Sequence, residues 1–398
     1  MAFPFFAPFA FLLLAALSGC GGGTSSSPEA ATTAVALSPA AALGEKIFRD
    51  VSLSASGQQS CASCHNPDNA HAPSNGLAVQ LGGGAGLTEP GFRAAPSLRY
   101  LRQTPAFFFD NAGTPTGGFD RDGRAQTLAE QARRPFLAAH EMANASTADV
   151  AQSLAKASYA SEFKKVFGDG VFADPDAAFD RAVFALQRYQ LEDADFAPFS
   201  SKYDAVLAGK LPLSEQELRG LALFNRSDKG NCASCHPSAR QANGSLPLFT
   251  DFTYDNLGVP RNDDIPANAA DPARYDLGLC GPDRTDLMDK NPGLCGAFKV
   301  PTLRNVATRQ VFFHNGKFKS LRETLRFYVQ RDTHPERWYP LVNGVPEKFN
   351  DLPEAYRGNV NVSEAPYNRQ PGQAPALSDA EIDDVMAFLS TLTDGYQP

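Results

Sequence analysis

Two copies of one pentapeptide, Cys61-Ala-Ser-Cys64-His65 and Cys232-Ala-Ser-Cys235-His236, decide how this chain folds. Cys-x-x-Cys-His is the attachment signature of c-type haem, in which two thiols form thioethers and the histidine becomes an axial ligand of the iron. A redox-active cysteine pair or half of a zinc site could also contain Cys-x-x-Cys. With seven cysteines and six histidines in 398 residues, chance does not explain two identical pentapeptides. We therefore predict two covalently bound haem c groups.

A similar helix precedes each of the two motifs. A Leu-Ser pair opens both segments, at residues 37–38 and 213–214, and serine is suited to cap the start of a helix. Gly44 and Phe48 in the first segment, like Gly220 and Phe224 in the second, lie four residues apart on one helical face. This repeat favours two cytochrome c-like units, in which the glycine admits a second helix and the phenylalanine packs towards the haem.

The remaining pattern predicts an all-α chain with long loops. Residues 151–167 and 175–189 have the apolar spacing of amphipathic helices. Short strands are conceivable in the Pro/Gly-rich connections, but no segment predicts a sheet. Ser378 and Glu381 form a capping box that opens a helix over residues 378–392, which suits the closing helix of the second unit. We expect two cytochrome c-like haem domains, over residues 38–205 and 206–398.

The N-terminus predicts export and a lipid anchor. Residues 1–17 are apolar and uncharged and lead into Leu17-Ser-Gly-Cys20, which is typical of a lipoprotein signal peptide over residues 1–20 with the lipid on Cys20. The Gly/Ser/Thr-rich residues 21–37 would then form a flexible tether between a membrane and a periplasmic enzyme. An ordinary cleaved signal and an uncleaved anchor are the alternatives. A net charge of −8 without a basic run excludes nucleic acid as an expected partner.

Two cysteines remain after the lipid and the haems are assigned. Cys280 and Cys295 would most simply form a disulfide in an oxidising compartment. Free thiols at both positions are the alternative.

The group opposite each histidine decides what each iron can do. Thr127 and Glu130 predict a capping box, which places Gln131 in a short helix that Pro135 ends. A glutamine and a carboxylate such as Glu141 beside an open iron would suit peroxide, because the carboxylate can move a proton between the peroxide oxygens. The spacing alone also allows such a glutamate to be merely solvated.

The second iron has two candidate ligands. Leu321, Leu325 and Tyr328 share one helical face, so the phenol points towards the haem-bearing core. An ordinary buried tyrosine would look the same. Methionine is the usual ligand of electron-carrying haem c, and Met288 is the main rival, with Met142 and Met386 the other methionines after the predicted signal.

These motifs together resemble the bacterial di-haem cytochrome c peroxidase and MauG superfamily. The resemblance rests on both haem motifs, on Asp122-Gly-Arg followed by Gln131, Pro135 and Glu141, and on residues 298–305 with Phe313-His-Asn-Gly316. It implies that Gln131, Pro135 and Glu141 line the peroxide pocket of the N-terminal haem. It also implies that Tyr328 binds the C-terminal iron, as in the MauG-like branch, where the peroxidases have methionine.

The resemblance implies an enzyme that uses hydrogen peroxide to form a high-valent di-haem state. That state would oxidise aromatic residues, above all tryptophan, of a partner protein. Residues 331–339, 351–353 and 391–396 are similar to MbnH-type enzymes, which suggests a copper-binding, MbnP-like partner. One alternative is a peroxidase fed by a small redox protein. Another is a non-enzymatic electron carrier, which would need Met288 or His71 on iron.

The chain departs from the family pattern in several places. Arg121 replaces the usual tryptophan between the haems, which leaves Phe119 or residues 107–109 to pack nearby, and Trp338 is either a packed aromatic or a surface relay. The positions of the family's calcium site are Ala94, Arg309 and Val311, so calcium is possible but not expected. His71 does not match a distal histidine and is interpreted as structural.

Overall fold

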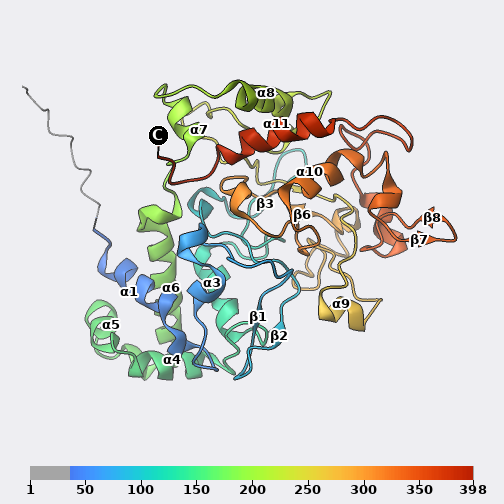
Figure 1. Ribbon diagram of the computed structural model, residues 1–398. Helices are drawn as coiled ribbons and strands as arrows, with labels where there is room; N and C mark the ends of the chain where they lie inside the picture. The colour runs from blue at the N-terminus through green and yellow to red at the C-terminus, as the bar shows by residue number, and fades with distance from the viewer. Residues whose placement is uncertain (1–35, 398) are drawn as a thin grey trace, which may run out of the picture. The chain divides into compact units, whose positions relative to one another are not determined.

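The computed structural model describes residues 36–397, so the predicted signal peptide, Cys20 and most of the tether lie outside the described residues. Within this range no helix is both long and apolar enough to cross a membrane. The α-helices are α1 Pro39–Arg49, α2 Cys61–Cys64, α3 Leu128–Leu137, α4 Thr147–Lys156, α5 Ala160–Phe167, α6 Pro175–Glu192, α7 Lys202–Leu207, α8 Glu215–Asn225, α9 Pro266–Ala270, α10 Leu321–Gln330 and α11 Asp379–Ser390 (Figure 1).

Helices dominate the structure, and four short antiparallel strand pairs add to them. The pairs are β1 Leu81–Gly82 with β2 Glu89–Pro90, β3 Phe108–Phe109 with β4 Pro115–Thr116, β5 Tyr254–Asp255 with β6 Phe298–Lys299, and β7 Leu341–Val342 with β8 Val345–Pro346. Short strands in the connections agree with the expectation from the sequence, but the small sheets that they form were not predicted. Each strand has only two residues, which is too short to produce the alternating apolar pattern that identifies a strand in a sequence.

Two helix pairs repeat the same close contact. In Figure 1, α1 runs beside α6 and α8 lies along α11. A Cβ atom built on Gly44 of α1 would lie 2.0 Å from the Ala185 carbonyl oxygen of α6, and one on Gly220 of α8 would lie 2.0 Å from that of Asp384 in α11. Each glycine thus lets two helix backbones touch, as the repeated sequence pattern predicts.

The two contact glycines should tolerate no side chain. We expect Gly44→Ala and Gly220→Ala each to lower the free energy of unfolding by about 1–3 kcal/mol, because the new methyl group overpacks against backbone. Gly84→Ala is the matched control, since a Cβ there meets nothing within 4 Å. Chemical denaturation of the three variants measures the difference, and equal stability of all three would contradict the contact.

Each helix pair belongs to its own apolar core. The first core contains Phe48 of α1 together with residues of α3, α4 and α6, and the second contains Phe224 of α8 together with residues of α10 and α11. The chain from Leu37 onward nevertheless groups into one compact unit. The predicted boundary between residues 205 and 206 therefore stays a prediction.

Two local expectations are wrong. The single helix predicted over residues 151–167 is two helices, because the chain is extended at Ala157 and turns Tyr159 inward, where its hydroxyl donates to the Asp50 carboxylate at 2.7 Å. Pro135 lies inside α3 rather than ending it. Its ring removes one backbone hydrogen bond, but buried Phe136 and the Ala138 N–H, which donates to the Arg134 carbonyl, hold the last turn.

Candidate haem sites

The first haem motif occupies α2 and faces a cavity of about 190 Å³. Cys61, Cys64 and His65 line this cavity, and both thiols are free. The His65 Nδ1–H faces the backbone carbonyl of Pro96 at 3.1 Å, so Nε2 is left for a metal. Burial lowers the pKa of His65 to about 4, which keeps its imidazole neutral, as ligation requires.

The second motif repeats this arrangement in another part of the chain. A 3₁₀ turn at Cys232–Ser234 carries the first thiol, and Cys232, Cys235 and His236 line a cavity of about 330 Å³. Here the His236 Nδ1–H faces the backbone carbonyl of Phe249 at 2.7 Å, again leaving Nε2 free. Burial lowers the pKa of this histidine as well.

The structure argues against the two alternatives for the motifs. Burial raises the pKa of Cys61 and Cys232 to about 12 each, whereas a redox-active cysteine needs a lowered pKa. In the described part of the chain, no three His, Cys, Asp or Glu side chains gather to hold a metal ion, whereas a structural zinc site needs four ligands. Paired thiols, a histidine with a free Nε2 and an adjoining cavity fit haem c in both places.

The three predicted peroxide-pocket residues meet in the first cavity. Gln131, Pro135 and Glu141 all line it together with the first haem motif. The Met142 N–H donates to the Pro135 carbonyl at 3.0 Å, which folds the chain back after α3 and brings Glu141 to the cavity wall. The Glu141 carbonyl accepts from the Gly83 N–H at 2.8 Å and from the Gln59 side chain.

Glu141 has the electrostatic setting of a proton carrier. Burial in the cavity wall, helped by the negative charge of Asp120, raises the pKa of its carboxyl to about 7. Arg134 opposes this shift only in part, because its guanidinium binds Asp283 (Nη2 to Oδ1, 2.6 Å) and forms no ion pair with Glu141. A carboxyl that titrates near neutral pH can both accept and release a proton during turnover.

Tyr328 lies in the second cavity with the second haem motif. Leu321, Leu325 and Tyr328, the expected face of α10, all line this cavity. Burial raises the pKa of the phenol well above its usual range, so a phenolate there would need a nearby cation such as ferric iron. Met288 lines neither cavity and packs instead against the core that contains Phe312 and Phe327.

The residues expected between the haems lie in different places. Arg121 lines both cavities, and Phe119 lines the second. Residues 107–109 line neither, since Phe107 packs on Tyr254 and its two successors are exposed in β3. Trp338 is half-buried and packs edge-on against Phe318 and Phe327.

His71 lines neither cavity. Its side chain is fully buried, stacks on Phe196 at 4.1 Å between ring centroids and has Nε2 2.7 Å from the Asp195 carboxylate. These contacts match the structural interpretation of this histidine.

The disulfide loop contributes to the first cavity, which the sequence did not indicate. Cys280 and Cys295 are joined, and Asp283 between them lines the first cavity. Asp283 lies 3.3 Å from the Arg124 guanidinium and also binds Arg134, so the loop is fastened to the wall beside Glu141. No sequence signal could have paired residues about 150 positions apart.

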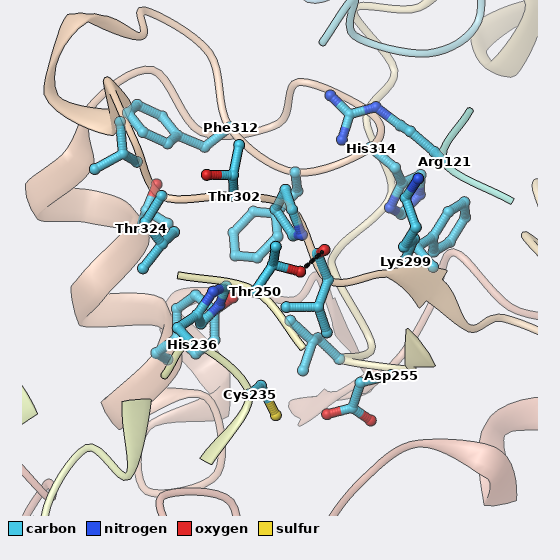
Figure 2. A pocket seen from close by; sticks show the side chains of 18 of the residues that line it. Arg121, Cys235, His236, Thr250, Asp255, Lys299, Thr302, Phe312, His314 and Thr324 are labelled. Atoms are coloured by element: carbon cyan, nitrogen blue, oxygen red, sulfur yellow. Dashed lines mark hydrogen bonds between the residues drawn. The ribbon is translucent and has the colours of Figure 1, made fainter. Parts of the chain in front are cut away.

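Lys299 was also missed as a candidate. It follows Phe298 in a segment that carries the family resemblance, and it lines the second cavity close to Arg121 and His314 (Figure 2). The sequence signal that could have identified Lys299 is a charged residue between two apolar ones, Phe298 and Val300.

Comparisons with known proteins are consistent with these two cavities. Residues 38–211 match the family model described as di-haem cytochrome c peroxidase. The chain is 37% identical over 400 residues to the methylamine utilization protein MauG of Paracoccus denitrificans, covering 98% of this chain and 95% of that protein. The diheme peroxidase BthA of Burkholderia thailandensis is 44% identical with a TM-score of 0.83, over 90% of this chain and 87% of that one. A MauG-like protein associated with microbial copper homeostasis is 25% identical with a TM-score of 0.61, over 90% of this chain and 91% of that one.

Proposed function

Because the chain belongs to the di-haem cytochrome c peroxidase and MauG family, whose members are peroxide-using oxidoreductases with two haem c groups, we propose that it oxidises aromatic residues of a partner protein with hydrogen peroxide. Tryptophan is the first candidate target. One observation carries the proposal: Tyr328, and no methionine of the described chain, lines the cavity of the second haem motif. Two electrons leave the partner, and one peroxide takes them up with two protons to give two waters.

The residues of the first cavity perform the peroxide chemistry. His65, with its imidazole oriented by the Pro96 carbonyl, would hold the iron of the first haem. The Glu141 carboxylate takes the proton from the inner peroxide oxygen and delivers it to the outer one, which becomes the leaving water. Gln131, which projects from α3 into the same cavity, orients the peroxide through its side-chain amide.

The residues of the second cavity serve to retain the oxidising equivalents. When bound, the two haems would supply the one-electron redox chemistry that links peroxide to a distant electron donor. His236 and Tyr328 would hold the second iron, and an anionic oxygen ligand favours the oxidised metal, whereas a thioether favours the reduced one. This arrangement suits slow oxidation of a residue on another protein.

The proposed location of the enzyme and its proposed partner rest on the N-terminal sequence and on similarity to relatives. A lipid on Cys20 and the tether that follows would hold the enzyme at a membrane in the periplasm. The likeness of residues 331–339, 351–353 and 391–396 to MbnH-type enzymes leads us to propose a copper-binding, MbnP-like partner, and one MauG-like relative is associated with microbial copper homeostasis.

The test begins with the fully oxidised, haem-loaded protein and stoichiometric hydrogen peroxide in the absence of any donor. We expect a prompt and long-lived change in the visible and near-infrared spectrum, followed by its decay when a tryptophan-containing copper-binding partner is added. Mass spectrometry of that partner should then show an oxidised tryptophan. A ferric protein that reacts only after one haem is reduced would overturn the proposal.

A second function is favoured by the diheme peroxidase BthA, to which the chain is 44% identical. In this alternative the enzyme reduces peroxide repeatedly with electrons from a small cytochrome or cupredoxin. Steady-state peroxide consumption separates the two: rapid turnover with a small redox protein, without modification of any protein, identifies the peroxidase.

The reaction with peroxide should depend on pH through Glu141. Its pKa of about 7 means that the proton-accepting carboxylate form grows as the pH rises through 7. We expect the rate constant for the reaction with peroxide, measured by stopped-flow absorbance, to rise through pH 7 and level off above it. A rate that falls over this interval would assign the working form to the protonated acid.

A further inference from the structure

Three cationic side chains lie in the wall where the two haem cavities meet. Arg121 lines both cavities, while Arg309 and Lys299 line the second. Figure 2 shows Arg121 and Lys299 beside His314 on one side of the second cavity, with Cys235 and His236 on the other. The backbone joins two of the three, because the Lys299 N–H donates to the Arg121 carbonyl at 2.9 Å.

These side chains bond only to backbone carbonyls. The Arg121 Nε donates to the Ala94 carbonyl at 2.9 Å, and the Arg309 Nη2 donates to the neighbouring Ala95 carbonyl at 2.8 Å. The Lys299 ammonium donates to the Gly118 carbonyl. Between residues 36 and 397, no carboxylate forms an ion pair with any of the three, and the buried Nη1 of Arg309 has no hydrogen-bond partner.

Two other arginines of the structure form ion pairs with carboxylates instead. Arg304 binds both carboxylate oxygens of Asp204 at 2.8 and 2.9 Å, and Arg93 binds Asp122 and Asp276 at 2.6–2.7 Å. A buried charge without a counter-charge is costly, and proteins pair it or use it to bind a ligand. Asp120 also lines both cavities, but it forms no ion pair with Arg121, Arg309 or Lys299, and burial together with repulsion by Arg309 and Arg93 lowers the pKa of Arg121 to about 9.

Haem carries carboxylates that could bind these three unpaired cations directly. Each haem has two propionate groups, and a carboxylate is the anion that a guanidinium binds in planar, bidentate geometry. We propose that Arg121 forms a fixed cationic bridge that binds propionates of both haems, with Arg309 and Lys299 binding propionates of the second haem only.

The bridge has an electrical consequence. A fixed positive charge next to a haem stabilises its reduced, less positive state and so raises its midpoint potential. Because Arg121 faces both cavities, it acts on both haems, whereas Lys299 faces one. The inference rests on the two haems of the family and not on the oxidation of a partner protein, so potentials test it separately from the proposed function.

Spectroelectrochemical titration of the haem-loaded protein tests the bridge. We expect Arg121→Gln to lower the midpoint potentials of both haems and Lys299→Gln to lower only that of the second. Arg240→Gln is the matched control, since Arg240 also donates only to backbone carbonyls but is exposed. Potentials unchanged in Arg121→Gln with both haems present would overturn the proposal.

The charge-conserving variants keep the test decisive if a glutamine variant fails to retain its haems. In Arg121→Lys and Arg309→Lys the positive charge stays, but the planar pair of donors is lost. We expect the propionate bending bands in the resonance Raman spectrum to shift in both lysine variants. Bands identical to those of the parent protein would show that neither guanidinium touches a propionate.

Discussion

Replacement of Glu141 by glutamine is expected to slow the reaction with hydrogen peroxide by about 10²–10⁴-fold. Glutamine keeps the shape of the side chain and the backbone bonds to Gly83 and Gln59, but it cannot carry a proton between the peroxide oxygens. The cavity, the thiols and His65 are untouched, so both haems should remain attached. Stopped-flow absorbance measures the rate, and haem absorbance confirms the loading.

Glu130→Gln is the control for this variant. Glu130 is an exposed carboxylate of α3, the helix that carries Gln131, and its side chain accepts only the Gln126 N–H. We expect its rate to equal that of the parent protein. The pH dependence through 7 should vanish in Glu141→Gln and persist in Glu130→Gln. A fast Glu141→Gln variant would assign the proton transfer to another group.

Local and repeated features of the fold could be predicted from the sequence. The spacing of Gly44 and Phe48, and of Gly220 and Phe224, correctly indicated two helix contacts next to two haem cavities. Each of these two Gly/Phe pairs depends on residues that are four positions apart in one helix. Helical periodicity likewise placed Tyr328 on the cavity face of α10.

The rest of the site could not be predicted, because it depends on contacts between distant segments. Asp283 of the disulfide loop lines the same cavity as Glu141 and binds Arg134 of α3. Lys299 reaches the wall between the cavities through a backbone bond from β6 to Arg121. No spacing rule brings such segments together.

The helix around Pro135 shows a different limit of prediction from the sequence. Proline predicts the end of a helix because it lacks an N–H, yet α3 continues to Leu137. The burial of Phe136 outweighs the loss of one backbone hydrogen bond. Tertiary packing overrides the local preference here, and only the structure reports that packing.

Replacement of Tyr328 by methionine is expected to raise the midpoint potential of the second haem. A thioether favours ferrous iron and a phenolate favours ferric iron, and axial ligands tune haem potentials over roughly 0.8 V. The second haem of the variant should therefore accept electrons from a mild reductant that leaves the parent protein oxidised. Potentiometric titration followed by visible absorbance measures the change.

The same substitution should also change the reaction with peroxide. Without an anionic ligand that favours the oxidised metal, we expect the long-lived spectrum formed without a donor to be lost, and turnover with a small redox protein to increase. Tyr367→Phe is the control. It removes a phenolic hydroxyl from the same cavity, and the Tyr367 ring centroid lies 6.2 Å from that of Tyr328. If Tyr328→Phe, which loses only the oxygen, kept the parent potential and the long-lived spectrum, the phenol would not be the ligand. Another group would then have to hold the second iron.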